Sequence, residues 1–287
     1  MSEASGGYFL PHQSPWPLVG SVGLFCTLAG LAHFLHGGTM GMMGVGLVVL
    51  AIMLFGWFGV VIRESEAGKY NTQVDKTFRW AMTWFIFSEV MFFAAFFGAL
   101  FYVRELAVPW LGGAGAKAAT GELLWPGFQA IWPSNGPAQV GGPFQPMEAW
   151  GIPAINTLIL LSSGVTVTWA HWGLKERKRG QLILGLIATV ALGFLFITLQ
   201  AHEYGVAYSE MNLKLSTGIY GSTFFMLTGF HGLHVTLGAI MLTVILFRSI
   251  KGHFTPEHHF GFEAVAWYWH FVDVVWLGLF IFVYWLV

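Results

Sequence analysis

The chain has 287 residues, of which 56% are hydrophobic and only 9% are charged, and its formal net charge is −1. Soluble domains typically carry about 25% charged residues, so this composition excludes a soluble globular protein. A mean hydropathy of +0.66 indicates a membrane protein with several spans. No basic tail favours a nucleic-acid partner, and the single cysteine, Cys26, excludes a disulfide within the chain. Residues 1–17 lack a basic region followed by a short apolar core, so we expect no cleaved signal peptide.

Seven stretches are long and apolar enough to span a bilayer as helices, which requires roughly 20 residues each. None shows the period-two alternation of a transmembrane β-strand. The sequence therefore predicts an all-α fold, that of a polytopic membrane protein with seven transmembrane helices. In chain order, the predicted spans are 18–34, 42–62, 78–103, 152–172, 182–201, 219–247 and 264–286.

The basic residues lie mostly on one side of the predicted membrane. The loops after the second, fourth and sixth spans hold ten of the 13 Lys and Arg residues, and the loops on the other side hold three. Because basic loops stay on the cytoplasmic side, we expect the N-terminus in the cytoplasm or mitochondrial matrix and the C-terminus outside. The ten are Arg63, Lys69, Lys76, Arg79, Lys175, Arg177, Lys178, Arg179, Arg248 and Lys251, and the three are Arg104, Lys117 and Lys214.

One connection, residues 104–151, is much longer than the others and is rich in Gly and Pro, as in WPSNGPAQVGGPFQP. A structureless connection of this length is usually either functional or disordered. Because it lies on the outer side of the predicted membrane, it could cover a partner. The alternative is a tolerated surface insertion.

A single carboxyl, Glu89, lies deep in the third span, within WFIFSEVMFFAAFF. A charge at bilayer depth costs at least ~2.5 kcal/mol, and this helix offers no basic residue within several turns. We therefore predict that Glu89 is protonated near neutral pH. Such a group could handle protons or gate a partner. The alternative is a neutral acid that hydrogen-bonds to a neighbouring helix.

In the sixth span, His231 and His234 are three residues apart and share one side of the helix. Such a pair could form half of a metal or haem site. The further ligands would have to come from other helices, and His171, Glu203 and His270 are the candidates at similar depth. A dihaem site needs two separated histidines on each of two helices, and the last span has only one. The alternative is that both histidines are hydrogen-bonded packing groups between helices.

The last span carries Glu263, His270 and Asp273 on one face, because steps of seven and three residues return to nearly the same side of a helix. We expect His270 and Asp273 to find partners on other helices. No serine is placed to complete a nucleophilic triad with them.

A further group of residues lies where the second and sixth spans meet the inner membrane surface. Cations beside an aromatic-rich apolar surface can hold anionic lipid headgroups. The ordinary excess of basic residues on the inner side explains the Lys and Arg residues, but it does not explain the histidines. The group contains Arg63, Glu64, Arg248, Lys251, His253, His258 and His259.

Seven motifs spread over the chain match one protein family. They are VIRE at 61–64, FIFSEVMFF at 85–93, INTLILLSSGVTVTWAH at 155–171, LQAHEY at 199–204, FHGLHV at 230–235, HHFGFEA at 258–264 and WYWHFVDVVW at 267–276. From Trp57 onward the sequence resembles subunit III of the haem–copper cytochrome c oxidases of bacteria and mitochondria. The resemblance implies two helices, within 1–76, and a five-helix bundle, within 77–287, separated by a V-shaped cleft that holds lipid.

The resemblance also implies that this chain does no redox chemistry of its own. Subunit III has no catalytic residue and binds no metal and no haem. It packs on subunit I, in one complex with subunit II, and haem A and copper lie in these partners. It binds phospholipids, supports proton uptake and protects the oxidase against inactivation during turnover. Glu89 falls on the family's buried carboxyl of the third helix. The implied lipid-binding residues are Trp57, Arg63, Glu64, Phe85, Arg248, Lys251, His253 and His258.

Some positions depart from the family pattern. Val60 stands where an acid is frequent, KYNTQ at 69–73 replaces a His-Thr-Pro run, and Trp172 replaces a histidine. The longer outer loop could touch an additional subunit or cytochrome c. The alternatives that stay open are subunit III of a quinol oxidase, which often lacks the first two helices, a haem-binding membrane cytochrome, and a transporter. The expected location is the bacterial inner membrane or the mitochondrial inner membrane.

Overall fold

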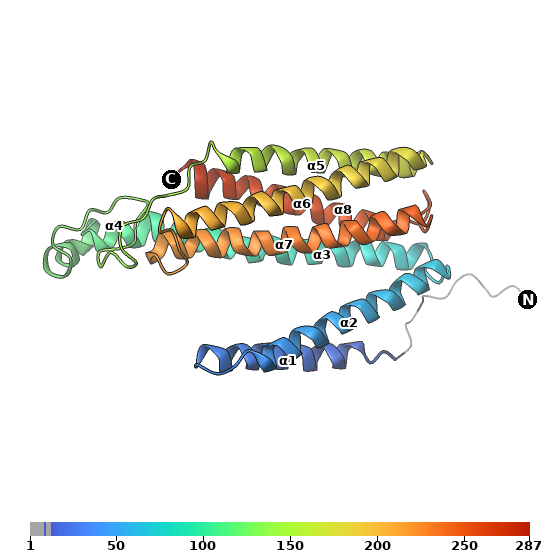
Figure 1. Cartoon of the computed structure of the whole chain (residues 1–287), viewed down its shortest axis with the longest axis horizontal. Helices are drawn as coiled ribbons and strands as arrows, with labels where there is room; N and C mark the ends of the chain where they lie inside the picture. Colours follow the sequence, from blue (N-terminus) through green and yellow to red (C-terminus); the bar gives the residue numbers. More distant parts are fainter. Residues whose placement is uncertain (1–8, 10–12) are drawn as a thin grey trace, which may run out of the picture. The chain divides into compact units, whose positions relative to one another are not determined.

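The computed structural model describes residue 9 and residues 13–287. Within this part of the chain every regular element is a helix, and seven helices are long and apolar enough to cross a membrane (Figure 1). The all-α fold and the predicted number of spans are thereby confirmed. The seven helices are α1 (Trp16–Leu35), α2 (Gly41–Glu66), α3 (Thr72–Tyr102), α5 (Ile152–Lys175), α6 (Arg179–Ser209), α7 (Gly218–Ile250) and α8 (Phe260–Leu279).

Several helices extend beyond the predicted spans. Helix α3 begins at Thr72 and continues through a π-helical turn (Val103–Ala107) into α4 (Val108–Leu111), and α8 continues into a π-helical segment (Phe280–Trp285). Hydropathy detects only the apolar middle of a span, whereas charged and polar residues with adequate helix propensity continue the helix into the membrane interface.

The chain folds as two compact units, Met1–Trp80 and Ala81–Val287, which we call unit 1 and unit 2. In unit 1, α1 and α2 run antiparallel and pack against each other, and the C-terminal part of α2 diverges from α1 (Figure 1). Gly30 permits the close approach, because a Cβ atom there would lie only 2.2 Å from the backbone nitrogen of Met43. Small residues at such crossings let membrane helices pack by van der Waals contact.

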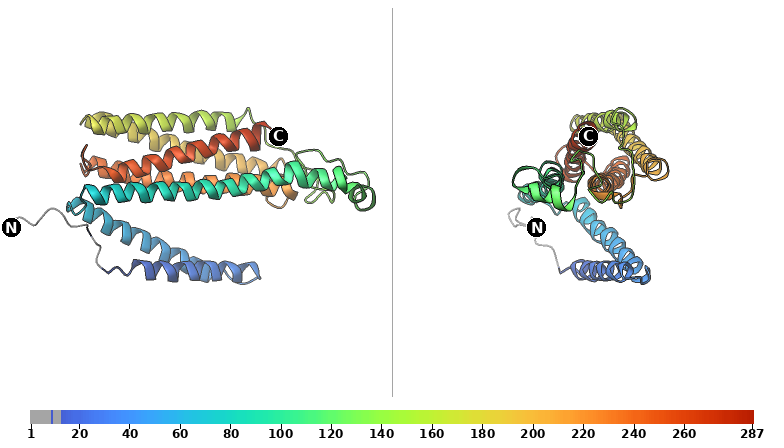
Figure 2. Two further views of the ribbon diagram at one scale, coloured as in Figure 1. Left: turned by 180° about the vertical axis from the view of Figure 1, so that it is seen from behind. Right: turned by 90° about the vertical axis from the view of Figure 1, so that its left-hand side faces the viewer.

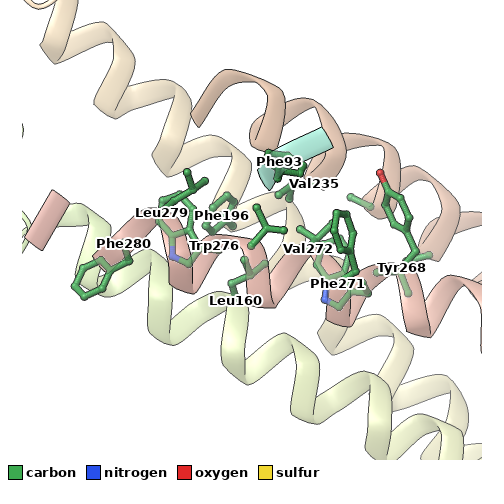
Figure 3. Packing of buried hydrophobic residues seen from close by; sticks show 14 of the residues in the cluster. Phe93, Leu160, Phe196, Val235, Tyr268, Phe271, Val272, Trp276, Leu279 and Phe280 are labelled. Atoms are coloured by element: carbon green, nitrogen blue, oxygen red, sulfur yellow. The ribbon is translucent and has the colours of Figure 1, made fainter. Parts of the chain in front are cut away.

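Unit 2 is a bundle of α5, α6, α7 and α8 together with α3 from residue 81 onward, seen end-on in Figure 2. Helix α8 supplies the core, and its largest side chains, Trp269 and Trp276, are fully buried. The Trp269 ring fills a notch over two glycines, since Cβ atoms at Gly193 of α6 and Gly238 of α7 would lie 2.9 and 2.8 Å from it. Figure 3 shows the surrounding cluster, which includes Phe93, Leu160, Phe196, Val235, Tyr268, Phe271, Val272, Trp276, Leu279 and Phe280.

The long outer connection is less irregular than the sequence suggested. Besides the helical residues that follow α3, it contains short helical turns at Gly115–Lys117 and Thr120–Leu124. Its second half is tied to the α6–α7 connection, where Asn212 Nδ2 donates to the carbonyl oxygens of Gly141 and Pro143 at 2.9 and 3.0 Å. The side chain of one asparagine thus satisfies two loop carbonyls that would otherwise need water.

At the opposite end of unit 2, α5 ends, α6 begins, α7 ends and α8 begins. We call this the basic end, because the Lys and Arg residues of two connections gather there. They are Lys175, Arg177, Lys178, Arg179, Arg248 and Lys251.

Candidate functional site

The carboxyl of Glu89 on α3 meets the imidazole of His234 on α7. Glu89 Oε2 lies 2.9 Å from His234 Nε2, and the two side chains are only 22% and 12% exposed. Tyr268 of α8 stacks on the imidazole ring, and Phe92 and Phe93 of α3 pack against it from other directions. The pair is therefore enclosed mostly by aromatic side chains.

The hydrogen bonds of His234 restrict where its protons lie. His234 Nδ1 is 2.6 Å from the backbone oxygen of Phe230. A carbonyl oxygen can only accept, so Nδ1 carries a hydrogen. Nε2 then either donates to an ionised Glu89 or accepts from a protonated Glu89. In both cases the pair is neutral as a whole, which avoids the cost of an isolated charge at this depth.

The two histidines of α7 serve different neighbours despite their three-residue spacing. His231 is 1% exposed, its Nε2 donates to the backbone oxygen of Val272 at 3.2 Å, and its ring packs on Trp276. His234 faces α3 instead. Within residue 9 and residues 13–287, no three His, Cys, Asp or Glu side chains are grouped so that they could hold a metal ion.

Polar side chains form a row along the contact between α5 and α8. The indole of Trp269 donates to Ser163 Oγ at 2.8 Å, and the indole of Trp276 donates to Thr157 Oγ1 at 2.9 Å. Hydroxyl groups on α5 therefore satisfy the polar ends of the two buried tryptophans, which keeps both large rings in fixed orientations. His270 belongs to the same row, because its Nε2 lies 3.1 Å from Thr168 Oγ1.

Asp273 lies between His270 and Trp276 along α8 and is buried against α5. Its Oδ2 lies 3.5 Å from Nδ1 of His270 on the same helix, and the residue is only 6% exposed. Gly164 of α5 passes over the carboxyl so closely that a Cβ atom there would lie 2.4 Å from Oδ2. The absence of a side chain at Gly164 thus gives the carboxyl its place between the helices.

Replacing Gly164 with alanine should therefore displace the Asp273 carboxyl from its place between α5 and α8. Overpacking of this kind typically costs ~1–3 kcal/mol. We expect a lower midpoint for heat-induced loss of the chain's fold in detergent, followed by tryptophan fluorescence. Gly232 on α7 is a matched control, because a Cβ atom there would meet nothing within 4 Å. Equal midpoints for Gly164→Ala and Gly232→Ala would contradict the proposed close contact.

A second buried carboxyl, Glu203 of α6, lies near the other end of the bundle. The hydroxyl of Tyr284 donates to Glu203 Oε1 at 2.7 Å, and Gln200 Nε2 donates to the same oxygen at 3.1 Å. Glu203 is 1% exposed. Its sequence signal was an acid inside an apolar span, but no sequence pattern pointed to Tyr284, which follows 81 positions later.

The predicted lipid-binding residues divide between the two units. In unit 1, Trp57 is 43% exposed on α2, and Arg63 and Glu64 lie in the last turn of that helix. The hydroxyl of Tyr70 donates to Glu64 Oε2 at 2.9 Å. Burial, assisted by the Glu64 carboxylate, raises the pKa of Tyr70, so the phenol keeps the proton that it donates.

In unit 2, Phe85 is 45% exposed on α3 and stacks on Tyr268. At the basic end, the Arg248 guanidinium lies 4.4 Å from the ring centre of Phe254, a distance typical of a cation–π contact. Lys251 and His258 are exposed, and His253 is half-buried. Four of the predicted residues, Arg248, Lys251, His253 and His258, thus belong to α7's last turn and the connection that follows it.

Glu263, the remaining polar residue of the last span, lies in the first turn of α8. It is half-buried. Nearby at the same end, the rings of His171 on α5 and His259 lie 5.2 Å apart. Glu263 is therefore at the basic end, well separated along α8 from His270 and Asp273.

Comparison with known proteins points to the same family as the sequence motifs. The sequence model of the family "Cytochrome c oxidase subunit III" matches residues 6–120 and 123–287. Proteins named cytochrome c oxidase subunit 3 are similar to this chain over 286 residues, which is 99% of both chains: the goldfish Carassius auratus protein is 42% identical, the Pongo abelii protein 43% and the Homo sapiens protein 42%. On this similarity, which spans nearly the whole sequence, the chain belongs to the cytochrome c oxidase subunit III family.

Proposed function

We propose that this chain is the non-redox subunit III of a proton-pumping cytochrome c oxidase in an aerobic respiratory chain. It packs on subunit I, within one complex with subunit II, and the partner subunits hold haem A and copper. Its own role is to bind structural phospholipids, to support proton uptake and to protect the oxidase from inactivation during turnover. The family membership given above supports the identity of the subunit.

The observation that best supports a structural role is the exposure of large apolar side chains on α2 and on α3. Phe55 is 77% exposed, Trp80 is 68% exposed and Trp84 is 65% exposed. Exposed apolar patches of this kind mark contacts with other proteins or with lipid. A subunit that lies among other membrane subunits and holds lipid between them needs such faces.

The proposed lipid sites combine cations with aromatic groups. Of the eight residues implied by the family resemblance, three lie in the two-helix part, 1–76, and five lie in the five-helix part, 77–287. Arg248 stacks on Phe254, and Trp57 and Phe85 are exposed apolar groups. Basic residues near the membrane surface attract anionic headgroups, and aromatic residues favour the interface between headgroups and acyl chains.

Replacing Arg248 with alanine should release bound lipid. A basic residue at the membrane surface contributes about 1 kcal/mol to the attraction of an anionic headgroup, so we expect weaker retention of about one phospholipid per complex and faster loss of activity during turnover. Mass spectrometry of lipids extracted from the purified complex, together with the activity half-life, measures both effects.

Lys175 provides the control for this experiment. It lies in the last turn of α5 at the same basic end, so Lys175→Ala removes an equal charge outside the proposed site. Equal lipid content and equal half-life in wild type, Arg248→Ala and Lys175→Ala would contradict the proposed lipid role.

The proposed orientation follows from the basic residues. The basic end of unit 2 would face the bacterial cytoplasm or the mitochondrial matrix. The outer connection would then face the other side, where an additional subunit or cytochrome c could meet it. A membrane-impermeant thiol reagent added to intact cells tests this orientation. It should label the Lys117→Cys variant and should not label the Lys251→Cys variant.

A further inference from the structure

A pocket opens at the basic end of unit 2, on the side where α5, α6 and α7 meet. Its volume is about 310 Å³, at the lower end of the range of roughly 300–1,000 Å³ typical of ligand pockets. None of the eight residues proposed above to bind lipid lines it. The lining residues are Gly173, Leu174, Arg177, Arg179, Leu182, Ser249, Gly252, Phe254, Thr255, Pro256 and Glu257.

The inner wall of this pocket is apolar. Leu174 of α5 and Leu182 of α6 are buried, and Phe254 and Pro256 contribute further apolar surface from the α7–α8 connection. Next to the lining residues, Ile250 of α7 is 42% exposed on a helix long and apolar enough to cross a membrane. An acyl chain could therefore reach the wall from the lipid phase without crossing water.

The rim of the pocket is cationic. The guanidinium of Arg177 pairs with Glu257 Oε1 at 2.9 Å, and the guanidinium of Arg179 donates to the backbone oxygen of Ile250 at 2.6 Å. A backbone hydrogen bond of Glu257 itself, aided by Arg177, holds the pKa of the Glu257 carboxyl below its usual range. Glu257 is therefore ionised at neutral pH, and two cations face one anion, so the rim keeps an excess positive charge.

The same rim contains the N-terminus of α6. This helix begins at Arg179, and no side chain caps it. The first backbone N–H groups of an α-helix have no partner within the helix, and together with the helix dipole they favour an anion such as a phosphate group. The two arginines and the helix end thus offer donors to the same small volume.

A buried hydroxyl provides an independent indication of a ligand. Ser249 lines the pocket and is only 2% exposed, yet its Oγ has no hydrogen-bond partner among the described residues. Serine in a helix can usually bond a backbone carbonyl one turn earlier, and a buried hydroxyl without a partner costs stability. A polar group of a bound molecule would satisfy it.

The backbone conformation of Arg177 is a further feature of the rim. Its φ angle is +59°, in the left-handed region that costs a residue other than glycine about 1–2 kcal/mol. The N–H of Lys178 donates to the Gly173 oxygen at 2.8 Å, as in the helix ends where glycine normally takes this position. An arginine that occupies a glycine position supplies a guanidinium at the rim, where glycine would supply nothing.

From these features we infer that the pocket is a second lipid site: it binds one anionic phospholipid, whose phosphate lies at the α6 N-terminus between Arg177 and Arg179 and whose acyl chain lies on Leu174 and Leu182. Ser249 donates to an oxygen of the headgroup or glycerol backbone. None of the eight residues proposed above lines this site, although Phe254 of its wall also makes the cation–π contact with Arg248. A soluble phosphate compound offers the same anionic chemistry, but it would leave the apolar wall uncovered.

Three variants of the whole oxidase complex test this inference. Arg179→Ala removes a rim cation, Ser249→Ala removes the buried hydroxyl, and Arg177→Gly removes a cation while relieving the left-handed backbone. Native mass spectrometry of the complex in mild detergent should show about one anionic phospholipid fewer in each variant. Titration of delipidated complex with phosphatidylglycerol should show about fivefold weaker binding for Arg179→Ala.

Arg177→Gly also serves as the folding control, because it should leave thermal stability unchanged or raised. Lys175→Ala lies at the same end outside the pocket and should keep the lipid. Arg248→Ala should lose a different lipid, so the double variant Arg248→Ala/Arg179→Ala should lose about two. Unchanged lipid content in all three pocket variants would overturn this site even if Arg248→Ala behaves as proposed. Weaker binding of radiolabelled inorganic phosphate with unchanged lipid would also overturn it, in favour of a soluble phosphate compound.

Discussion

Replacing Trp269 with alanine should destabilise unit 2 more than any other single truncation, by about 3–5 kcal/mol. Trp269 is 0% exposed. Its ring lies in the notch formed by Gly193 and Gly238, and its Nε1 donates to Ser163. One side chain therefore holds α8 to α5, α6 and α7 at once. The backbones on either side cannot collapse into the space left behind without moving whole helices, so a large cavity would remain.

The effect can be measured as the midpoint of heat-induced dissociation of the chain from the purified complex in detergent. Trp285 is a matched control, because it is 53% exposed at the end of the π-helical segment after α8. Trp285→Ala should shift the midpoint little. If both variants shifted it equally, the notch at Gly193 and Gly238 would not be the main packing contact of α8.

Replacing Glu89 with alanine should also destabilise unit 2. The change leaves His234 Nε2 without its partner inside an aromatic enclosure, and a buried polar group that loses its partner costs about 1–3 kcal/mol. Glu89→Gln should cost much less, because the amide N–H can still donate to a neutral imidazole. The thermal midpoint of oxidase activity should therefore fall in the order wild type, glutamine variant, alanine variant.

Infrared spectroscopy then decides the protonation state predicted for Glu89. A protonated acid gives a carboxylic C=O band that is present in wild type and missing in Glu89→Gln. If that band is the same in both proteins, the proton lies on His234 and Glu89 is ionised. If the alanine and glutamine variants are as stable as wild type, the pair contributes nothing to the packing of α3 on α7.

The membrane spans could be predicted because their signal is local. Length and hydropathy alone identify a stretch such as 219–247, and α7 (Gly218–Ile250) extends only slightly beyond it. The ends of α3 and α6 could not be predicted, because a helix that leaves the hydrocarbon no longer needs apolar residues. Asp75 and Arg79, one turn apart and ion-paired in the first part of α3, illustrate this.

The sequence indicated which residues make polar contacts inside the membrane, but it did not indicate which residues they contact. Helical spacing placed His231 and His234 on one side of α7, but it carries no information on how α7 is rotated against its neighbours. The partner of His234 is Glu89, which precedes it by 145 positions. The partner of Glu203 is Tyr284, in a stretch that showed only an apolar, aromatic pattern. Such pairings depend on the rotation and depth of whole helices.

The chemical environment of Asp273 likewise needed the structure. The sequence placed it on one face with His270, one helical turn away, and suggested partners on other helices. His270 does reach Thr168 of α5, whereas Asp273 lies under the backbone of Gly164. A glycine gives no sequence signal for the group that packs on it, so this contact could not be predicted.

Purification through an affinity tag tests most directly whether this chain is a subunit without redox groups in an oxygen-reducing complex. Solubilisation in mild detergent should recover larger membrane subunits that carry haem A and copper, in stoichiometric amounts with the tagged chain. After dissociation of the complex, the tagged chain alone should show no haem absorption. Recovery without any haem- and copper-carrying partner, or a Soret band on the separated chain, would contradict this role.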